Sequence, residues 1–426
     1  MSNDTPLPND TPPPNDTPPP NDTAPPNDTP PPNDTTMTVP QGRFTLTRPT
    51  GGRTALRAWD AADELLLQRV ADLDVSPGAT TVIVGDSHGA LSIALAELAP
   101  TVVVDRHSSS RAIASNATAN GVDPANLHVV DALTAPPERI DVALIRPART
   151  LAMLEHQLRS LAPSLHSGSV VVSSSMVKHL HTSILEVFER VLGPTTTSLA
   201  HRRARLVNTV VSGDRPSDDE PSRPWDWPRF TQIEPGPLQL CWMPGVFSAG
   251  KLDRGTSLLL AHLPEIEPGD SVVDLGCGNG VLGLVAAIDQ PDAAVTLVDD
   301  SSMAVAAARG TFDANGASGR VVWGDGLFDW APDEDGDLGG SDGFGAAEGS
   351  ADVVLCNPPF HDDHALVDAA AWKMFSESRR ALRSGGEMWV VGNRHLGYHV
   401  KLRRLFGNVD VVSSDPKFVV LRSVCP

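Results

Sequence analysis

Short apolar runs alternate with Ala- and Leu-rich segments along most of this chain. In 81–96 the run TVIV is followed by the turn GDSHG and the stretch ALSIALA, and in 271–287 SVVDL is followed by GCGNG and VLGLVAA. Compact apolar runs of four or five residues are typical of strands buried on both faces, and the segments after the turns have helical composition. The pattern predicts two doubly wound α/β domains in tandem.

The two halves also repeat their segments in the same order. The matching pairs are TVVVD at 101–105 with VTLVD at 295–299, ANG at 119–121 with ANG at 314–316, and DVALIRPA at 141–148 with DVVLCNPP at 352–359. Asp105 and Asp299 are 194 positions apart, and so are Asp131 and Asp325. This spacing predicts an internal duplication in which these aspartates correspond, with an acidic Gly/Asp insertion at 333–349 in the second copy.

Two polar stretches divide the chain. Residues 1–36 repeat Asn-Asp-Thr with prolines between, a composition that cannot bury enough apolar surface to fold, so we expect a disordered tail. Residues 213–228 are rich in proline and acid, as linkers are. The predicted domains are therefore 37–212 and 229–426.

Composition and charge exclude several classes of protein. No apolar run reaches the roughly 18 residues of a membrane span, and the four cysteines lack the spacing of a metal site, so we expect a soluble, cytoplasmic protein without a metal. The net charge of −20 argues against nucleic acid, but twelve acidic residues are concentrated in the tail and the insertion. The clusters HRRAR (201–205) and KLRRLFGN (401–408) stay candidate phosphate contacts, although such clusters are usually solvated surface.

A glycine-rich turn follows the first strand of the second half. It contains Asp274, Gly276, Gly278 and Gly280, and glycines allow backbone to approach a ligand at the start of a helix. The spacing differs from the G-x-G-x-x-G of dinucleotide-binding folds and resembles the first motif of S-adenosylmethionine-dependent methyltransferases, although an oxidoreductase or a simple tight turn also fits.

Two further aspartates follow the next strands of the second half. Asp299 is placed to accept hydrogen bonds from two ribose hydroxyls, which suits NAD enzymes equally well. Asp325 suits the amino group of an adenine, or is a solvated turn residue. Neither aspartate alone decides which cofactor binds.

The NPPF sequence, Asn357, Pro358, Pro359 and Phe360, favours transfer to an amine. It resembles the turn that class I methyltransferases carry after their fourth strand when they methylate a nitrogen conjugated with a ring or carbonyl. The side-chain oxygen of Asn357 and the carbonyl of Pro358 are placed to accept the two N–H groups and aim the nitrogen lone pair. Phe360 is placed to stack on a planar substrate.

Nearly all of 40–426 is similar to the large-subunit ribosomal RNA guanine-N2 methyltransferase family. The stretches that carry the resemblance are VDLGCGNGVLGL, VDDSSMAVAAA, VLCNPPFHDDHAL, GNRHLGYHVKLRRLFGN, KFVVL, RAWDAADELLLQRV and GVFSAGKLDRGTSLLL. The resemblance implies S-adenosylmethionine as cofactor, with Phe247, Asp253 and Gly255 near it. It also implies a specific guanine of 23S rRNA as substrate, protein-free or in an assembly intermediate, and a monomeric enzyme.

The first copy lacks this chemistry. Residues 85–90 have lost the glycine pattern, and Arg146 stands where the second copy has Asn357. A guanidinium cannot accept amine hydrogens. The resemblance implies that this half binds RNA, and Arg146 then either contacts phosphate or forms an internal ion pair. Methylation of 16S rRNA, methylation of a protein glutamine amide and a noncatalytic RNA-binding assembly factor remain alternatives.

Overall fold

The computed structural model describes residues 35–48, 56–73, 75–76, 78–212, 227–233, 237–248, 250–328, 347–359 and 364–426. The predicted tail, linker and acidic insertion lie mostly outside these residues. Strand β1 (Thr36–Val39) starts one residue inside the predicted tail, because Thr36 pairs with Thr45 of β2 (Gly42–Thr45) in a hairpin.

The first half contains a seven-stranded sheet in which only the last two pairings are antiparallel. Its strands, in spatial order, are β5 (His128–Asp131), β4 (Thr101–Val104), β3 (Thr81–Val84), β6 (Ile140–Ile145), β7 (Leu165–Met176), β9 (Ala204–Thr209) and β8 (Thr195–Thr197). Its helices are α1 (Ala61–Ala71), α2 (Ala90–Ala94), α3 (His107–Ala119), α4 (Leu151–Leu161) and α5 (Thr182–Val191).

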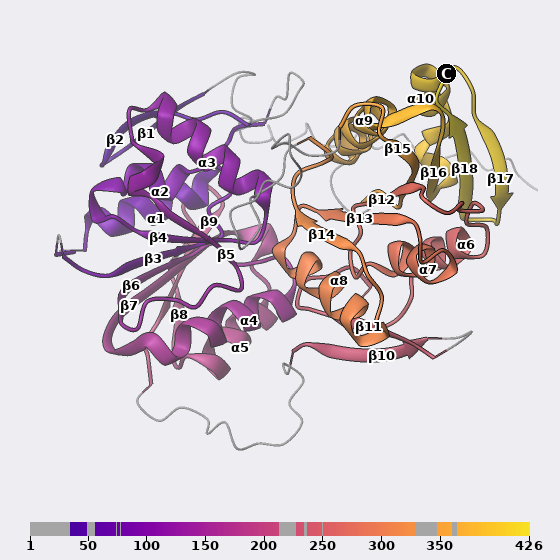
Figure 1. Ribbon diagram of the computed structural model, residues 1–426. Helices are drawn as coiled ribbons and strands as arrows, with labels where there is room; N and C mark the ends of the chain where they lie inside the picture. Colours follow the sequence, from indigo (N-terminus) through magenta and orange to yellow (C-terminus); the bar gives the residue numbers. More distant parts are fainter. Residues whose placement is uncertain are drawn as a thin grey trace, which may run out of the picture.

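The second half repeats this arrangement beside the first (Figure 1). Its strands, in spatial order, are β14 (Arg320–Trp323), β13 (Ala294–Asp299), β12 (Ser271–Leu275), β15 (Ala351–Cys356), β16 (Leu382–Asn393), β18 (Phe418–Val424) and β17 (Asp410–Ser414). Its helices are α6 (Arg254–Leu260), α7 (Val281–Asp289), α8 (Ser302–Asn315), α9 (His364–Ala381) and α10 (Tyr398–Phe406). The prediction of two tandem doubly wound domains is confirmed.

A hairpin precedes each sheet, and the repeated ANG tripeptide explains how it is fastened. Hairpin β1–β2 is tied to α3 by Asn120, whose amide exchanges two hydrogen bonds with the backbone of Thr45. In the second half β10 (Arg229–Ile233) pairs with β11 (Leu238–Trp242), and Asn315 exchanges the same two bonds with the backbone of Gln239. The tripeptide is therefore a structural clamp in both copies.

Sheet register corrects the predicted correspondence of the aspartates. Val84 and Leu275 each precede the turn glycine of their copy, and they pair with Val103 and Val298 respectively. The residue of the first copy that corresponds to Asp299 is therefore Val104, one position before Asp105. By the same register, Asp131 pairs with Val104 whereas Trp323 pairs with Asp299, so Asp131 corresponds to Trp323 and not to Asp325. Asp105 corresponds instead to Asp300, at the offset of 195 that also relates Asn120 to Asn315. The connection from that asparagine to the end of the next strand is three residues shorter in the second copy, which explains the mismatch of Asp131.

One of the three apolar clusters spans both halves. A continuous cluster of buried side chains runs from Met153 and Leu154 of α4 to Met303 and Ala304 of α8. Burial of this kind is the main source of folding free energy, so the halves stabilise each other. Among the described helices, none is both long and apolar enough to cross a membrane.

Candidate functional site

The glycine turn between β12 and α7 has the backbone conformation that its sequence requires. Gly276, Gly278 and Gly280 have φ of +73°, +56° and +79°, in the left-handed region that favours glycine. A Cβ on Gly280 would lie 2.9 Å from Leu297, whereas a Cβ on Gly278 would meet no described atom within 4 Å. Gly280 thus permits close packing, and Gly278 faces open space that a ligand can occupy.

Two carboxylates support this turn. Asp274 is fully buried and accepts a hydrogen bond from the Gly283 N–H at 2.9 Å, so it joins β12 to α7. Asp299 accepts from the Gly278 N–H at 2.9 Å through Oδ2 and from the Ser301 N–H at 2.9 Å through Oδ1. Burial raises the pKa of Asp274 to about 7 and that of Asp299 to about 6. Asp299 is therefore fixed against the glycine turn.

Asn357 follows β15 with its amide held in one orientation. Its Nδ2 donates to Thr256 Oγ1 at 2.8 Å, while its Oδ1 is buried and has no hydrogen-bond partner among the described residues. A buried acceptor without a partner is costly, so it marks a place where a ligand donor is expected. Pro358 is buried and Pro359 is exposed, whereas Phe360 lies outside the described residues.

The segment before the glycine turn, residues 245–260, positions helix α6 beside Asn357. Asp253 caps this helix by accepting from the N–H groups of Gly255 and Thr256 at 2.9 and 3.2 Å. A Cβ on Gly255 would lie 3.1 Å from Phe418, so glycine allows the helix to pack against β18. Phe247 is 46% exposed in the preceding loop. Thr256, which the sequence analysis did not single out, is the residue of this segment that contacts Asn357.

Asp325 lies beside a lysine and close to the first half. Lys373 Nζ contacts both the carboxylate and the backbone oxygen of Asp325 at 2.6 Å. Nearby, His107 of α3 packs edge-on against Trp323, with ring centroids 5.4 Å apart, and burial lowers its pKa to about 4. The first half therefore contributes a neutral side chain to this edge of the second half.

The corresponding positions of the first copy are filled by its own side chains. Asp86 turns into the degenerate loop and accepts from the N–H groups of Gly89, Leu91 and Ser92. Arg146 lies 2.9 Å from Asp60, and its side chain is only 19% exposed.

A second carboxylate completes this buried cluster. Arg146 Nε lies 3.1 Å from Asp63 Oδ1, and its Nη1 donates to the backbone oxygen of Ser174. Burial raises the pKa of Asp63, and Arg146 opposes that rise. Of the two alternatives for Arg146, the structure shows the internal ion pair.

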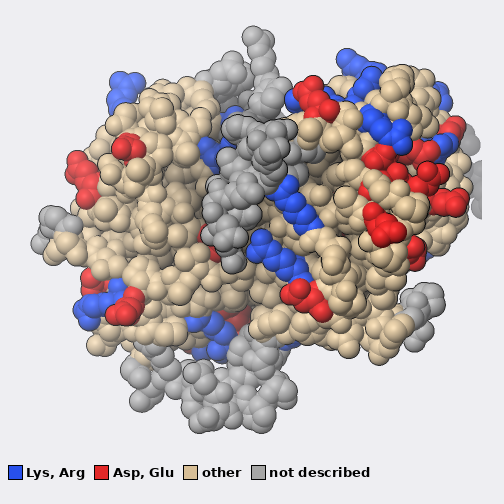
Figure 2. All heavy atoms as spheres, viewed as in Figure 1, with Lys and Arg blue, Asp and Glu red and all other residues tan. Residues whose placement is uncertain are grey.

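The arginine clusters are partly engaged within the protein. Arg202 pairs with Glu64 at 2.9 Å, Lys401 pairs with Asp368 at 2.9 Å, and the Arg404 guanidinium lies 5.2 Å from the centre of the Trp372 ring. In Figure 2, Lys and Arg side chains lie along the boundary between the halves. The face seen in Figure 2 therefore carries basic side chains where the two halves meet.

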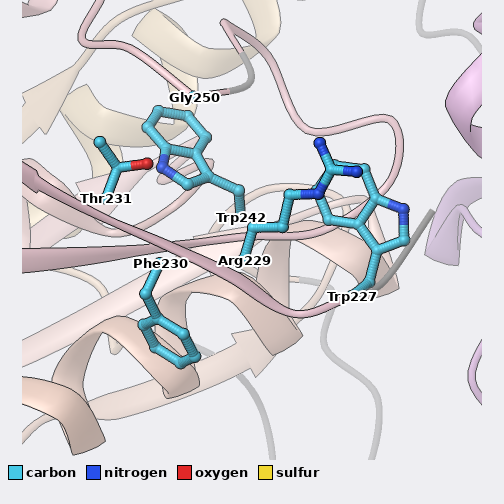
Figure 3. A pocket seen from close by; sticks show the side chains of 6 residues that line it. All are labelled: Trp227, Arg229, Phe230, Thr231, Trp242 and Gly250. Atoms are coloured by element: carbon cyan, nitrogen blue, oxygen red, sulfur yellow. The ribbon is translucent and has the colours of Figure 1, made fainter. Parts of the chain in front are cut away.

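A cavity of about 380 Å³ lies against hairpin β10–β11 (Figure 3). It is lined by Trp227, Arg229, Phe230, Thr231, Trp242 and Gly250. None of the predicted site residues lines it, so we do not assign it to the reaction. No group of three or more potential metal ligands occurs among the described residues.

Two different family models match the two halves of the chain. The model of the RLMG N-terminal domain matches residues 34–213, and that of the methyltransferase small domain matches residues 237–338 and 331–422. The ribosomal RNA large subunit methyltransferase G of Streptomyces avermitilis is 46% identical over 91% of this chain and 98% of its own length. The protein of the same name from Aeromonas hydrophila is 39% identical over 92% of this chain and 99% of its own length.

Among solved structures, the T. thermophilus 16S rRNA guanine-N2 methyltransferase, in complex with AdoMet and guanosine, has the same fold. It matches with a TM-score of 0.68 and 22% identity over 92% of this chain and 98% of its own length. The fold, the glycine turn and the family match define an S-adenosylmethionine-dependent methyltransferase with one intact and one degenerate copy of the domain. The chain belongs to the ribosomal RNA large subunit methyltransferase G family.

Proposed function

We propose that this enzyme methylates the exocyclic N2 of one guanine in 23S rRNA. The observation that carries the proposal is the buried, unpartnered Oδ1 of Asn357 at the end of β15, on an amide whose Nδ2 is already bound to Thr256. Such an oxygen accepts an N–H group, which an amino substrate offers. The names of the relatives, which specify large-subunit rRNA, support the choice of substrate.

We assign the cofactor to the second copy alone. S-adenosylmethionine, when bound, supplies the methyl group from its sulfonium. The open space over Gly278 fits a ligand lying on the glycine turn formed with Gly276 and Gly280, and Asp299 would accept from its ribose hydroxyls. Asp274 braces the turn from behind, and Asp325 would accept from the adenine amino group beside Lys373. Calorimetry should accordingly give one site per chain.

The amine is aimed by acceptors that are fixed before it arrives. The guanine amino group shares its lone pair with the ring, so it is a poor nucleophile while it stays planar. Asn357 Oδ1 and the carbonyl of Pro358 accept its two N–H bonds and turn the lone pair toward the methyl group. Because Thr256 holds the other end of the amide, Asn357 does not reorganise during the reaction.

The base must leave its helix to reach this site. In a Watson–Crick pair the guanine amino group already donates to the opposite cytosine, and neighbouring bases cover both ring faces. Extrusion costs a few kcal/mol and is easiest where the base is unpaired, so we infer that protein-free rRNA or an early assembly intermediate is the substrate. Phe360 would stack on the extruded ring.

The first copy would bind the RNA backbone near the site. Arg106, just before α3, has a side chain that is 64% exposed although it lies 3.6 Å from Asp300, and Figure 2 shows basic side chains along the boundary. Phosphate contacts release counterions, so activity should fall steeply as salt rises. Since each chain carries both copies, we propose that the enzyme is a monomer. We also propose that it acts in the cytoplasm, where rRNA is its substrate.

Nuclease digestion and mass spectrometry of rRNA after reaction with the enzyme test the proposal. We expect N2-methylguanine at one position of 23S rRNA. Methylation of 16S rRNA instead would contradict the proposed RNA but not the proposed guanine N2. Finding N6-methyladenine, or methyl label only in a protein glutamine, would overturn guanine N2 as the methylated group.

A further inference from the structure

Two helices of the two copies are capped by aspartates from the opposite copy. Met303, in the first turn of α8, donates its N–H to Asp105 Oδ1 at 3.1 Å. Ser108, in the first turn of α3, donates its N–H to Asp300 Oδ1 at 2.7 Å. Helix α3 has no cap from its own N-cap residue, Arg106, so the second copy supplies this bond. Unpaired N–H groups at a helix start need such acceptors.

Asp105 makes the larger set of contacts with the second copy. Its Oδ1 also accepts from the hydroxyls of Ser301 and Ser302, both at 3.0 Å, and its backbone oxygen accepts from the Ser302 N–H at 2.8 Å. Trp323 Nε1 reaches the backbone oxygen of Asp105 at 3.3 Å. One residue of the degenerate copy thus fixes the whole turn between β13 and α8.

That turn also holds the carboxylate assigned to the cofactor ribose. The Ser301 N–H donates to Asp299 Oδ1 at 2.9 Å, while the Ser301 hydroxyl donates to Asp105. A shift of Ser301 would therefore release one oxygen of Asp299. We propose that Asp105 is a positioning residue that orients Asp299 through Ser301; this inference rests on the cofactor site proposed above.

The effect should be on orientation more than on folding. Ser301 still caps α8 through its own hydroxyl, which accepts from the Ala304 N–H at 3.2 Å, and the shared apolar core still joins the halves. Removing the Asp105 carboxylate deletes the bonds to the serine hydroxyls and to Met303, but its backbone bonds remain. The turn is then less constrained while the helix persists.

The test compares Asp105→Ala with Asp131→Ala in the full chain. Asp131 is the matched control, because it also caps a turn after a strand of the first copy, but among the described residues its carboxylate bonds only to Leu133 and Thr134 of that copy. Calorimetry with S-adenosylmethionine should show roughly fivefold weaker binding for Asp105→Ala, the typical cost of a lost cap, and unchanged binding for Asp131→Ala. Hydrogen exchange in the cofactor-free chain should be faster at 301–303 only in the first variant.

Asp105→Asn keeps an acceptor oxygen and should restore most of the affinity. If Asp105→Ala does not fold, Ser302→Ala removes one of the same bonds and should give a smaller loss of affinity with the same exchange signature. Wild-type affinity in a folded Asp105→Ala, or an equal loss in Asp131→Ala, would overturn the inference. If the wild-type chain binds S-adenosylmethionine but methylates another group, the proposed substrate would be wrong and the role of Asp105 would be unaffected.

Discussion

The two copies have the same order of strands, and they differ in the residues at the ends of those strands. The second copy has Asp299 as the last residue of β13 and Asn357 directly after β15, where the first has Val104 and Arg146. Fold and chemistry are therefore separable in this chain: the sheet survives without the site because its apolar strands, and not the site residues, bury the core.

The first copy pairs its polar side chains internally at two positions that correspond to the proposed site. The Asp86 carboxylate accepts hydrogen bonds from backbone N–H groups of its own loop, and Arg146 forms ion pairs with Asp60 and Asp63. In the second copy the equivalent positions keep an open glycine at Gly278 and unpaired acceptor capacity at Asn357. At these corresponding positions, the second copy keeps an open glycine and an unpaired acceptor, whereas the first copy pairs its polar side chains internally.

The largest expected difference between the copies comes from substituting their equivalent residues. Asn357→Ala should lower kcat roughly a hundred- to a thousandfold, the usual cost of losing one preorganised polar group, with little change in cofactor affinity. Arg146→Met should lower the free energy of unfolding by about 2 to 3 kcal/mol, less than for a fully buried pair because Asp60 is 41% exposed, with kcat per folded molecule near wild type. Steady-state kinetics measures kcat, and denaturant unfolding measures the free energy of unfolding. If Arg146→Met lowered kcat as much as Asn357→Ala does, the first copy would not be merely structural at this position.

A smaller effect should come from releasing the Asn357 amide. Thr256→Val removes the acceptor of its Nδ2 at nearly constant volume, and leaving a buried donor unpaired costs about 1 to 3 kcal/mol, so kcat should fall roughly tenfold or more. The KM for S-adenosylmethionine should change little, and Thr256→Ser should recover activity. Ser257→Ala is the control, since its hydroxyl bonds only the backbone of Asp253 among the described contacts. Loss of activity in both variants would indicate damage to α6 in general.

The smallest effect should be a pH dependence that only the intact copy has. Burial raises the pKa of Asp299 from 3.8 to about 6, and bonds from ribose hydroxyls favour its ionised form. Affinity for S-adenosylmethionine should therefore fall roughly fourfold from about pH 7.5 to about pH 5.5, as the ionised fraction drops. Calorimetry across this range measures it, and Asp299→Asn should bind weakly without this dependence.

Folding stability responds to the same group with the opposite sign. Because the folded pKa of Asp299 lies above the unfolded value, the folded chain holds this proton more tightly. Its contribution to stability is present below about pH 4 and is lost as the pH rises through about 6. Stronger cofactor binding at low pH would show that Asp299 does not act as an ionised acceptor.

The sequence predicted the architecture because apolar strands and helices are local patterns, and the motifs located the strand ends of the second copy. It misaligned Asp105 with Asp299 because the second copy has two consecutive aspartates, Asp299 and Asp300, and only the strand register shows that Asp105 corresponds to the second of them. It missed Thr256 because the contact with Asn357 joins residues 101 positions apart and depends on how α6 packs. The positions of Asn357 and Arg146 after corresponding strands were predicted correctly.

The exchanged helix caps have a consequence for how such a chain could arise. Residue 105 contacts 303 and residue 108 contacts 300, while Arg106 and Ser301 pair with each other, and each partner is 195 positions from its counterpart. This is the pattern of an isologous interface, in which one surface is complementary to itself. A single-domain ancestor with this surface could have formed a symmetric dimer. Fusion of two copies would then guarantee a partner for every active domain, leaving one of the two free to lose its cofactor.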